Sequence, residues 1–378
     1  MKFSKIALAV SLAFAALGSA HADLTIGVVQ PLTGPASGLG IPVKNGIMVW
    51  PKTIGGETVK LIVLDDASDP TTGVKDTQRL VTDDKVDVIV GSSATPVAIP
   101  MADVTAEAAT PQLATSPAVL PPGKDKWFFR MPQSTDVMAF AVAKHMKEHG
   151  VKTVGFLGYT DAYGEAWLKA LTAEGEKNGI KIVATERFAR ADTSVTGQVL
   201  KITSANPDAI LIVASGSGAG MPQKAVMERG FKGKVYQTHA AATQDLMRVA
   251  GKDAEGAYVV SGPATVAEQL PESHPSKKMA VDFVTTYEKT YGVGSRNQFA
   301  GHSADALTVL EKAVPVALKK AKPGTPEFRS ALRDAFETMG RTVLAHGILN
   351  WTPDNHWGYT NETGVILKVV NGQFKVDQ

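Results

Sequence analysis

Short apolar runs alternate with amphipathic stretches along most of this chain, a pattern typical of parallel strands joined by crossover helices. The predicted strands are rich in β-branched residues and end in polar, Gly or Pro turns. They are residues 24–30, 58–64, 86–90, 153–157, 180–185, 209–214, 234–237 and 257–261. The intervening stretches predict helices over 74–84, 97–109, 137–149, 163–178, 221–230, 277–291, 303–320 and 326–339.

The predicted elements form two strand-and-helix series, one before residue 130 and one between residues 150 and 262. Helices then return without a new strand series. If those late helices pack back on the first series, the chain crosses between two lobes more than once, which produces a hinge of several strands. The length agrees with two lobes, since a chain of this size exceeds what one hydrophobic core usually organises.

The N-terminus has the features of a cleavable signal peptide. Lys2 and Lys5 precede an apolar run over residues 6–17, and Ala20-His21-Ala22 has the small-x-small pattern of a cleavage site. A short core helix is the alternative. We expect cleavage after Ala22 and a periplasmic product, because no other stretch approaches the ~20 apolar residues of a membrane span.

Composition excludes several kinds of chemistry and partner. The chain has no Cys, so disulfides, cysteine nucleophiles and a lipid-modified cysteine are all excluded. With 39 Lys and Arg against 37 Asp and Glu, and no long run of one sign, it has no electrostatic footprint for nucleic acid.

Two hydroxyl-rich loops follow predicted strands of the first half, where ligands bind in open parallel sheets. The loop over 91–96 carries Ser92, Ser93 and Thr95 before a proline, and the loop over 114–117 carries Thr115 in a similar setting. We expect Thr95 to cap a helix and both loops to open helices whose N-termini hold a carboxylate. The alternative is that these hydroxyls only cap their own helices.

Three further candidates come from loops of the second half. Tyr163 opens a predicted helix, where it can cover a ligand or simply be a half-buried aromatic residue. The small residues of 214–220, which include Ser217, leave room for a ligand. They lack the Gly-x-Gly-x-x-Gly spacing and the lysine of a nucleotide site. His239 follows another strand, although a histidine there is more often a satisfied polar residue.

Catalytic machinery is not visible in the sequence. There is no Gly-x-Ser-x-Gly elbow, no His-Glu-x-x-His motif and no His/Asp spacing that would hold a catalytic metal. Asp65, Asp66 and Asp69 lack the glycine and glutamate of an EF-hand, so we interpret them as turn and cap residues. We therefore expect no enzymatic activity, no catalytic residue, no metal ligand and no cofactor.

Several motifs together resemble the leucine/isoleucine/valine-binding branch of type I periplasmic binding proteins, over nearly the whole sequence after residue 22. They are Gly-Val-Val-Gln-Pro-Leu-Thr-Gly-Pro at 27–35, Asn45-Gly46, Leu-Asp-Asp-Ala-Ser-Asp-Pro at 64–70, and Gly155-Phe156-Leu157-Gly158 through Tyr163-Gly164. The resemblance implies two Rossmann-like α/β lobes with three hinge crossings, ligand capture by closure, and delivery to an ABC permease in the inner membrane. We place lobe 1 at 23–132 plus 265–346, and lobe 2 at 133–264 plus 347–378.

The same resemblance implies a set of ligand-binding residues. The family's carboxylate grip matches the loop from Ser92 through Ser93 to Thr95 together with Ala114 and Thr115, and its covering tyrosine matches Tyr163. His239 stands where amino-acid binders have an acid that pairs with the ligand ammonium, and Leu39 replaces a wall aromatic. Ser217 and Phe299 complete the predicted set.

The replacement at His239 bears on the ligand. An ammonium group without an anionic partner in a closed cleft costs several kcal/mol, which favours an amine-free aromatic or aliphatic carboxylate over a branched-chain amino acid. Both ligand classes stay open at this point. A ligand-sensing receptor domain of the same fold and an exported nucleotide-dependent enzyme are the alternative functions.

Overall fold

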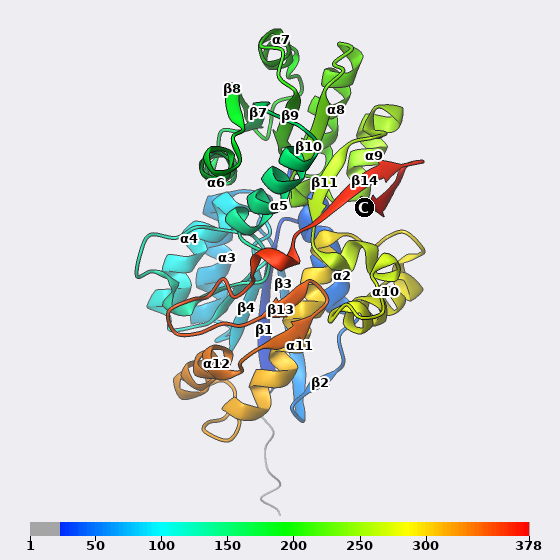
Figure 1. Ribbon diagram of the computed structural model, residues 1–378. Coiled ribbons are helices and arrows are strands. Elements are labelled where there is room, and N and C mark those ends of the chain that lie inside the picture. The colour runs from blue at the N-terminus through cyan, green and yellow to red at the C-terminus, as the bar shows by residue number, and fades with distance from the viewer. Residues whose placement is uncertain (1–22, 378) are drawn as a thin grey trace, which may run out of the picture.

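The computed structural model describes residues 23–377, which form two α/β lobes around separate sheets (Figure 1). The predicted signal peptide and its cleavage site lie outside these residues. The lobe with the N-terminal strands is at the bottom of Figure 1 in blue and cyan, and the second lobe is at the top in green. Within 23–377, no helix combines the length and apolar character that crossing a membrane requires.

The first sheet has six strands in the order β2-β3-β1-β4-β5-β6. All pairs are parallel except β2 with β3. The strands are β1 (Leu24–Gln30), β2 (Thr53–Ile54), β3 (Glu57–Asp65), β4 (Val88–Gly91), β5 (Gln112–Ala114) and β6 (Phe128–Arg130). The helices within this part of the chain are α2 (Ser37–Met48), α3 (Pro70–Thr82) and α4 (Thr95–Glu107).

The second sheet has seven strands in the order β15-β14-β11-β10-β9-β7-β8. Strands β7 to β11 pair in parallel, whereas β14 and β15 join as antiparallel strands. The strands are β7 (Thr153–Tyr159), β8 (Lys181–Phe188), β9 (Ala209–Val213), β10 (Lys234–Gln237), β11 (Tyr258–Ser261), β14 (Val365–Val370) and β15 (Gln373–Val376). The helices of this part are α5 (Thr135–Glu148), α6 (Ala162–Asn178), α7 (Thr196–Ser204), α8 (Ser217–Glu228) and α9 (Gln244–Ala250).

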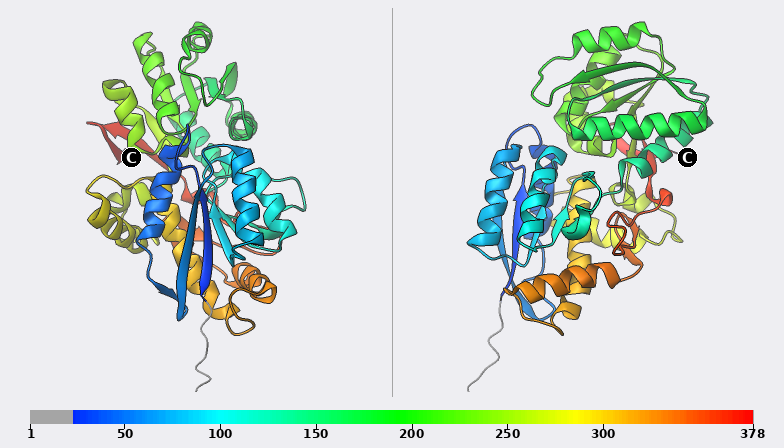
Figure 2. Two further views of the ribbon diagram at one scale, coloured as in Figure 1. Left: turned by 180° about the vertical axis from the view of Figure 1, so that it is seen from behind. Right: turned by 90° about the vertical axis from the view of Figure 1, so that its left-hand side faces the viewer.

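The late helices return to the first lobe. They are α10 (Lys277–Tyr291), α11 (Gln298–Ala317) and α12 (Pro326–Thr338), followed by the hairpin of β12 (Thr342–Leu344) and β13 (Gly347–Leu349). Helix α11 packs against α2 and α12, and Figure 2 shows α11 and α12, in yellow and orange, beside the blue and cyan elements. The chain therefore passes between the lobes three times: after β6, after β11 and after β13.

Helix α2 is the main element that the hydrophobic pattern did not predict. It contains Pro42 and three glycines, residues that disfavour a helix interior. It buries Leu39, Val43 and Ile47 against the core of the first lobe, so tertiary packing overrides its weak intrinsic helix propensity.

Candidate functional site

A narrow cavity lies between the lobes, where the carboxyl ends of strands from both sheets face each other. Six of the ten predicted ligand-binding residues line it. These six are Leu39, Ser93, Thr95, Tyr163, His239 and Phe299. The lining also includes four residues that the sequence analysis did not predict, namely Pro117, Arg190, Ser215 and Ala240.

Thr95 provides the free donors of the first-lobe wall. Helix α4 begins at Thr95 itself, and its N-cap, Ala94, has no side chain that can cap the helix, so the prediction of Thr95 as the cap is wrong by one residue. The Thr95 hydroxyl and backbone N–H make no hydrogen bond to any residue within 23–377. Since Pro96 has no N–H, these two groups of Thr95 are free donors at the start of a helix that borders the cavity.

Ser93 is held by a closed ring of hydrogen bonds. Its hydroxyl donates to Oε1 of Gln30 at 2.7 Å and lies 2.9 Å from the Thr115 hydroxyl, which accepts from Nε2 of Gln30 at 3.0 Å. The only consistent proton arrangement has Thr115 donating to Ser93. Ser93 therefore faces the cavity as an acceptor, and Thr115 lies behind it as a support.

The second hydroxyl-rich loop does not open a helix. Residues 115–124 are irregular after β5, so the predicted second helix N-terminus is wrong. Ala114 is the last residue of β5 and is buried in the sheet. Ser92 is likewise absent from the cavity wall, because its hydroxyl donates to Oδ2 of Asp66 at 2.7 Å. Burial raises the pKa of Asp66 to about 6.

The aspartates of residues 65–69 have the structural roles that we predicted. Asp69 caps helix α3 by accepting from the N–H of Thr72 at 2.7 Å. Asp65 accepts from the N–H groups of Leu32 and Ala67, each at 2.8 Å, and holds the turn together.

Tyr163 is buried at the start of α6, where Asp161 caps the helix by accepting from the Tyr163 N–H at 2.9 Å. Its hydroxyl donates to the Thr238 hydroxyl at 2.8 Å. Burial raises the pKa of Tyr163 well above its ordinary range, so the phenol stays protonated. Since that proton is used on Thr238, the Tyr163 hydroxyl can act toward the cavity only as an acceptor.

Arg190 is the functional group that sequence reasoning missed. It follows β8, and its Nε donates to Oδ2 of Asp161 at 2.5 Å while Nη1 donates to the Ser215 hydroxyl at 3.0 Å. Its guanidinium carbon lies 4.2 Å from the centre of the Tyr159 ring. The signal was available, since a cation just past the carboxyl end of a parallel strand lies at the ligand-binding edge. Ser217 is exposed on α8, and Ser215 takes the place predicted for it.

His239 is fully buried beside the cavity, with its ring edge-on to Tyr163 at a centroid distance of 5.9 Å. Its Nδ1 has no hydrogen-bond partner among the described residues. Burial, assisted by repulsion from His346, lowers the pKa of His239 to about 3. The ring is therefore neutral at physiological pH.

No acidic side chain within 23–377 lines this cavity. Asp161, which contacts the wall residue Arg190, is already paired with it. The remaining wall is apolar or aromatic, through Leu39, Pro117 and Phe299. The arrangement offers donors to a carboxylate at Thr95 and Arg190, and it offers no free anion to an ammonium group.

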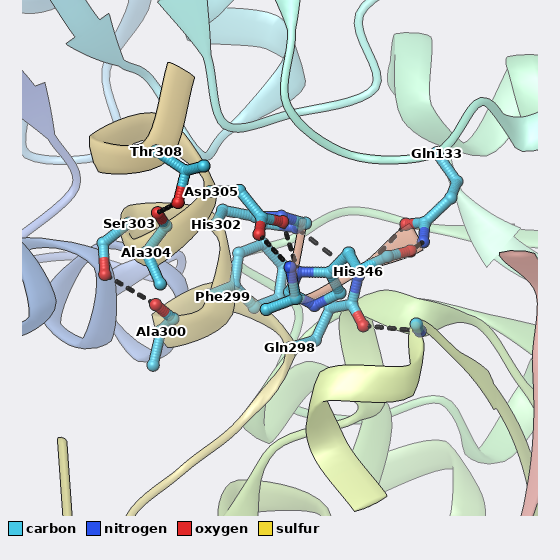
Figure 3. Close-up of polar contacts among 12 residues, drawn as sticks. Gln133, Gln298, Phe299, Ala300, His302, Ser303, Ala304, Asp305, Thr308 and His346 are labelled. Carbon is cyan, nitrogen blue, oxygen red and sulfur yellow. Dashed lines mark hydrogen bonds and ion pairs between the residues drawn. The ribbon is translucent and has the colours of Figure 1, made fainter. Parts of the chain in front are cut away.

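A buried polar network joins the three crossings next to the cavity, and Figure 3 shows its centre. Gln298 precedes the cavity residue Phe299, and its Oε1 accepts from Ser261 Oγ at 2.9 Å and from Gly262 N at 2.8 Å. Gln133, on the first crossing, donates from Nε2 to the carbonyl of His346 at 2.9 Å.

On the third crossing, His346 Nδ1 lies 2.7 Å from Oδ2 of Asp305 on α11 (Figure 3). The other oxygen of Asp305 accepts from the N–H of Ala345 at 2.7 Å. Gln298, the first residue of α11, also donates from Nε2 to Oε1 of Gln133 at 3.4 Å, so all three crossings are tied to α11.

Comparison with known proteins gives consistent matches. Residues 23–372 match the family model described as "Periplasmic binding protein". The chain is 30% identical over 266 residues to a Leu/Ile/Val-binding protein homolog of Brucella melitensis, covering 67% of this chain and 70% of that protein.

Among solved structures, an extracellular ligand-binding receptor from Rhodopseudomonas palustris is 47% identical with a TM-score of 0.92, covering 94% of this chain and 99% of that one. A benzoate complex of an ABC transporter solute-binding protein from R. palustris has a TM-score of 0.78 at 18% identity, covering 94% and 95% of the two chains. At that identity the likeness shows the fold alone.

Proposed function

Because this chain belongs to the periplasmic binding protein family, a family of solute-binding proteins, we propose that it captures a small carboxylate between its lobes for an ABC importer. The observation that carries the proposal is a single cavity lined from both lobes by predicted ligand-binding residues. A site divided in this way binds best when the lobes close, so ligand binding shifts the population toward the closed form. The permease then recognises that closed form.

We propose further that the ligand lacks an α-amine. Its carboxylate accepts from the hydroxyl and N–H of Thr95 at the start of α4 and from the guanidinium group of Arg190, and its far end lies against the apolar wall and neutral His239. Asp161 is already paired with Arg190, so this wall leaves no free carboxylate for a ligand ammonium group, whereas Arg190 attracts a ligand carboxylate. The apolar residues Leu39, Pro117 and Phe299 in these walls favour an aromatic or branched aliphatic acid of modest size.

Branched-chain amino acids are the second candidate, because the matched Brucella protein is named a Leu/Ile/Val-binding protein homolog. A thermal-shift screen separates the two classes. A ligand present at 100 times its dissociation constant stabilises the folded protein by about 2.7 kcal/mol. We expect stabilisation by amine-free acids such as benzoate and 3-phenylpropanoate, and none by leucine, isoleucine or valine.

A binding protein releases its ligand chemically unchanged, whereas an enzyme does not. Mass spectrometry after prolonged incubation should recover each stabilising acid intact, and X-ray scattering should show a more compact particle in its presence. Turnover of the acid, or identical scattering with and without it, would contradict a closing receptor.

We infer that residues 1–22 direct export and are removed after Ala22. Support comes from their charged flank, apolar run and small-x-small site, and from the family to which the rest of the chain belongs. N-terminal sequencing of the protein recovered from the periplasm should begin at Asp23.

A further inference from the structure

Two histidines and an aspartate meet outside the cavity lining, where the C-terminal end of helix α5 contacts Asp377, the residue after strand β15. His145 lies in the last turn of α5, and His149 is its C-cap residue. Asp377 directly follows β15. One nitrogen of each histidine and one oxygen of Asp377 lie within 4.8 Å of one another. In a tetrahedral zinc site with bonds of about 2.0–2.1 Å, ligand atoms are roughly 3.3 Å apart. The two imidazole rings are stacked, with centroids 3.9 Å apart and an angle of 23° between their planes, so one ring has to rotate for both lone pairs to reach one ion.

The hydrogen bonds of His149 fix which of its nitrogens carries the proton. Its Nδ1 lies 2.9 Å from the backbone carbonyl of His145, and a carbonyl only accepts, so Nδ1 must donate. In the neutral ring, Nε2 therefore carries a lone pair. That nitrogen lies 3.9 Å from Oδ2 of Asp377, too far for a hydrogen bond. A lone pair that faces a carboxylate in this way is stabilised by a cation placed between the two groups.

His145 faces the same carboxylate oxygen. Its Nε2 lies 2.8 Å from Oδ2 of Asp377, and its Nδ1 lies 2.9 Å from the hydroxyl of Tyr236. A metal ion would replace the proton on Nε2, and Nδ1–H would then donate to the Tyr236 oxygen. A metal-bound histidine is usually oriented by a hydrogen bond from its other ring nitrogen. Both rings already have such a partner: a backbone carbonyl for His149 and the Tyr236 phenol for His145.

The position also allows an ion to enter and favours positive charge. The His149 side chain is 34% exposed and that of Asp377 is 17% exposed, whereas His145 is nearly buried. The C-terminal end of a helix carries partial negative charge, which attracts a cation. The other group of this kind, His302 with Asp305 and His346, is fully buried, and both oxygens of Asp305 are engaged in the hinge.

We propose that His145, His149 and Asp377 bind a zinc ion, with a fourth position open to water, and that the ion fastens β15 to α5. Two imidazoles and one carboxylate are a ligand set that zinc favours. This site is independent of the ligand cavity and of the proposed transport function. It departs from our sequence-based expectation of no metal ligand, because nothing in the sequence places Asp377 beside the two histidines.

Titration of ZnCl₂ into metal-free, untagged protein tests the proposal by calorimetry and thermal unfolding. We expect one ion per chain and a rise of about 4 °C in Tm when zinc is at 100 times its dissociation constant. His149→Ala and Asp377→Asn should each weaken zinc binding by about tenfold or more. The matched control His274→Ala removes a histidine outside the cluster and should bind zinc like the wild type.

Cobalt(II) gives an independent readout, because its visible d–d absorption reports coordination by protein ligands. The intense bands of a four-coordinate site are expected in the wild type and in His274→Ala, and they should be lost in His149→Ala. Circular dichroism of the metal-free variants checks that each one folds. Absence of zinc binding by the wild type, or equal zinc binding by the wild type, His149→Ala and Asp377→Asn, would overturn the proposal.

Discussion

His346 packs so closely against Gly301 that a Cβ atom at position 301 would lie 2.1 Å from Cε1 of the histidine ring. Gly262 approaches the same ring, and a Cβ there would lie 2.2 Å from its Cδ2. Gly301 belongs to α11, Gly262 lies on the second crossing and His346 lies on the third. The His346 ring therefore packs between the glycine of the second crossing and the glycine of α11. This packing holds the second and third crossings against α11, the helix that also contains the cavity residue Phe299.

Substitution Gly301→Ala tests this packing. Helix propensity alone favours Ala over Gly by about 0.5–1 kcal/mol, but a methyl group forced against the ring costs about 1–3 kcal/mol. We expect a net loss of unfolding free energy, measured by urea denaturation. The control Gly197→Ala adds a methyl group in α7 where no atom outside the adjoining backbone lies within 4 Å, and it should leave stability equal or higher.

The double variant Gly301→Ala with His346→Ala separates the clash from other effects. Removing the ring makes room for the new methyl group, so the cost of Gly301→Ala should largely disappear in the His346→Ala background. An equal cost in both backgrounds would show that the ring does not require a glycine at 301.

Thr95 should contribute to ligand affinity through its hydroxyl. Thr95→Val keeps the shape of the side chain and removes the donor, so the affinity for the preferred acid should fall by about tenfold or more, as expected for a hydrogen bond to a charged group. Thr308→Val on α11, outside the cavity, is the matched control. Unchanged affinity in Thr95→Val by calorimetry would remove Thr95 from the site.

Arg190 should contribute a second contact of comparable size. Its guanidinium group is already oriented by Asp161 and Ser215, so Arg190→Gln should weaken acid binding by about 10–100-fold. Asp161→Asn keeps a helix-capping side chain and removes the balancing negative charge, so it should preserve or strengthen acid binding. Weaker acid binding by Asp161→Asn, together with normal acid binding by Arg190→Gln, would show that the ligand carboxylate does not lie beside Arg190.

The buried ring of His239 predicts a loss of stability in acid. Its pKa is about 3 in the folded state against 6.5 ordinarily, so the unfolded chain takes up the proton first as the pH falls. The stability contributed by His239 is complete above pH 6.5 and decreases below it, by about 2 kcal/mol at pH 5. Urea denaturation of wild type and His239→Asn at pH 7 and pH 5 should show a smaller pH effect in the variant. Equal pH effects would mean that His239 titrates normally.

The sequence predicted the fold well where hydrophobic periodicity and burial agree. Strands 24–30 and 234–237 and helix 277–291 have the predicted bounds. It failed at α2, whose glycines and proline hide a helix that tertiary packing creates. The sequence-based prediction also failed after β5. A Ser-Pro pair there has the composition of a helix start, but the chain continues as an irregular loop.

For the site, the family motif placed Thr95 and Tyr163 at the cavity, because loops after parallel strands converge there. It missed Arg190, whose orientation depends on Asp161 and Ser215, partners that are distant in sequence. A hydroxyl in such a loop does not by itself identify a wall residue, because Thr115 supports Ser93 from behind rather than lining the cavity.

We propose that the closed cavity accepts a carboxylate and rejects an ammonium group. Calorimetric titration with leucine and with 4-methylpentanoate tests it most directly, since the two differ only in the α-amine. We predict measurable binding of 4-methylpentanoate and at least tenfold weaker binding of leucine, because an unpaired buried ammonium costs several kcal/mol. Tighter binding of leucine than of 4-methylpentanoate would contradict the account and identify an amino-acid receptor.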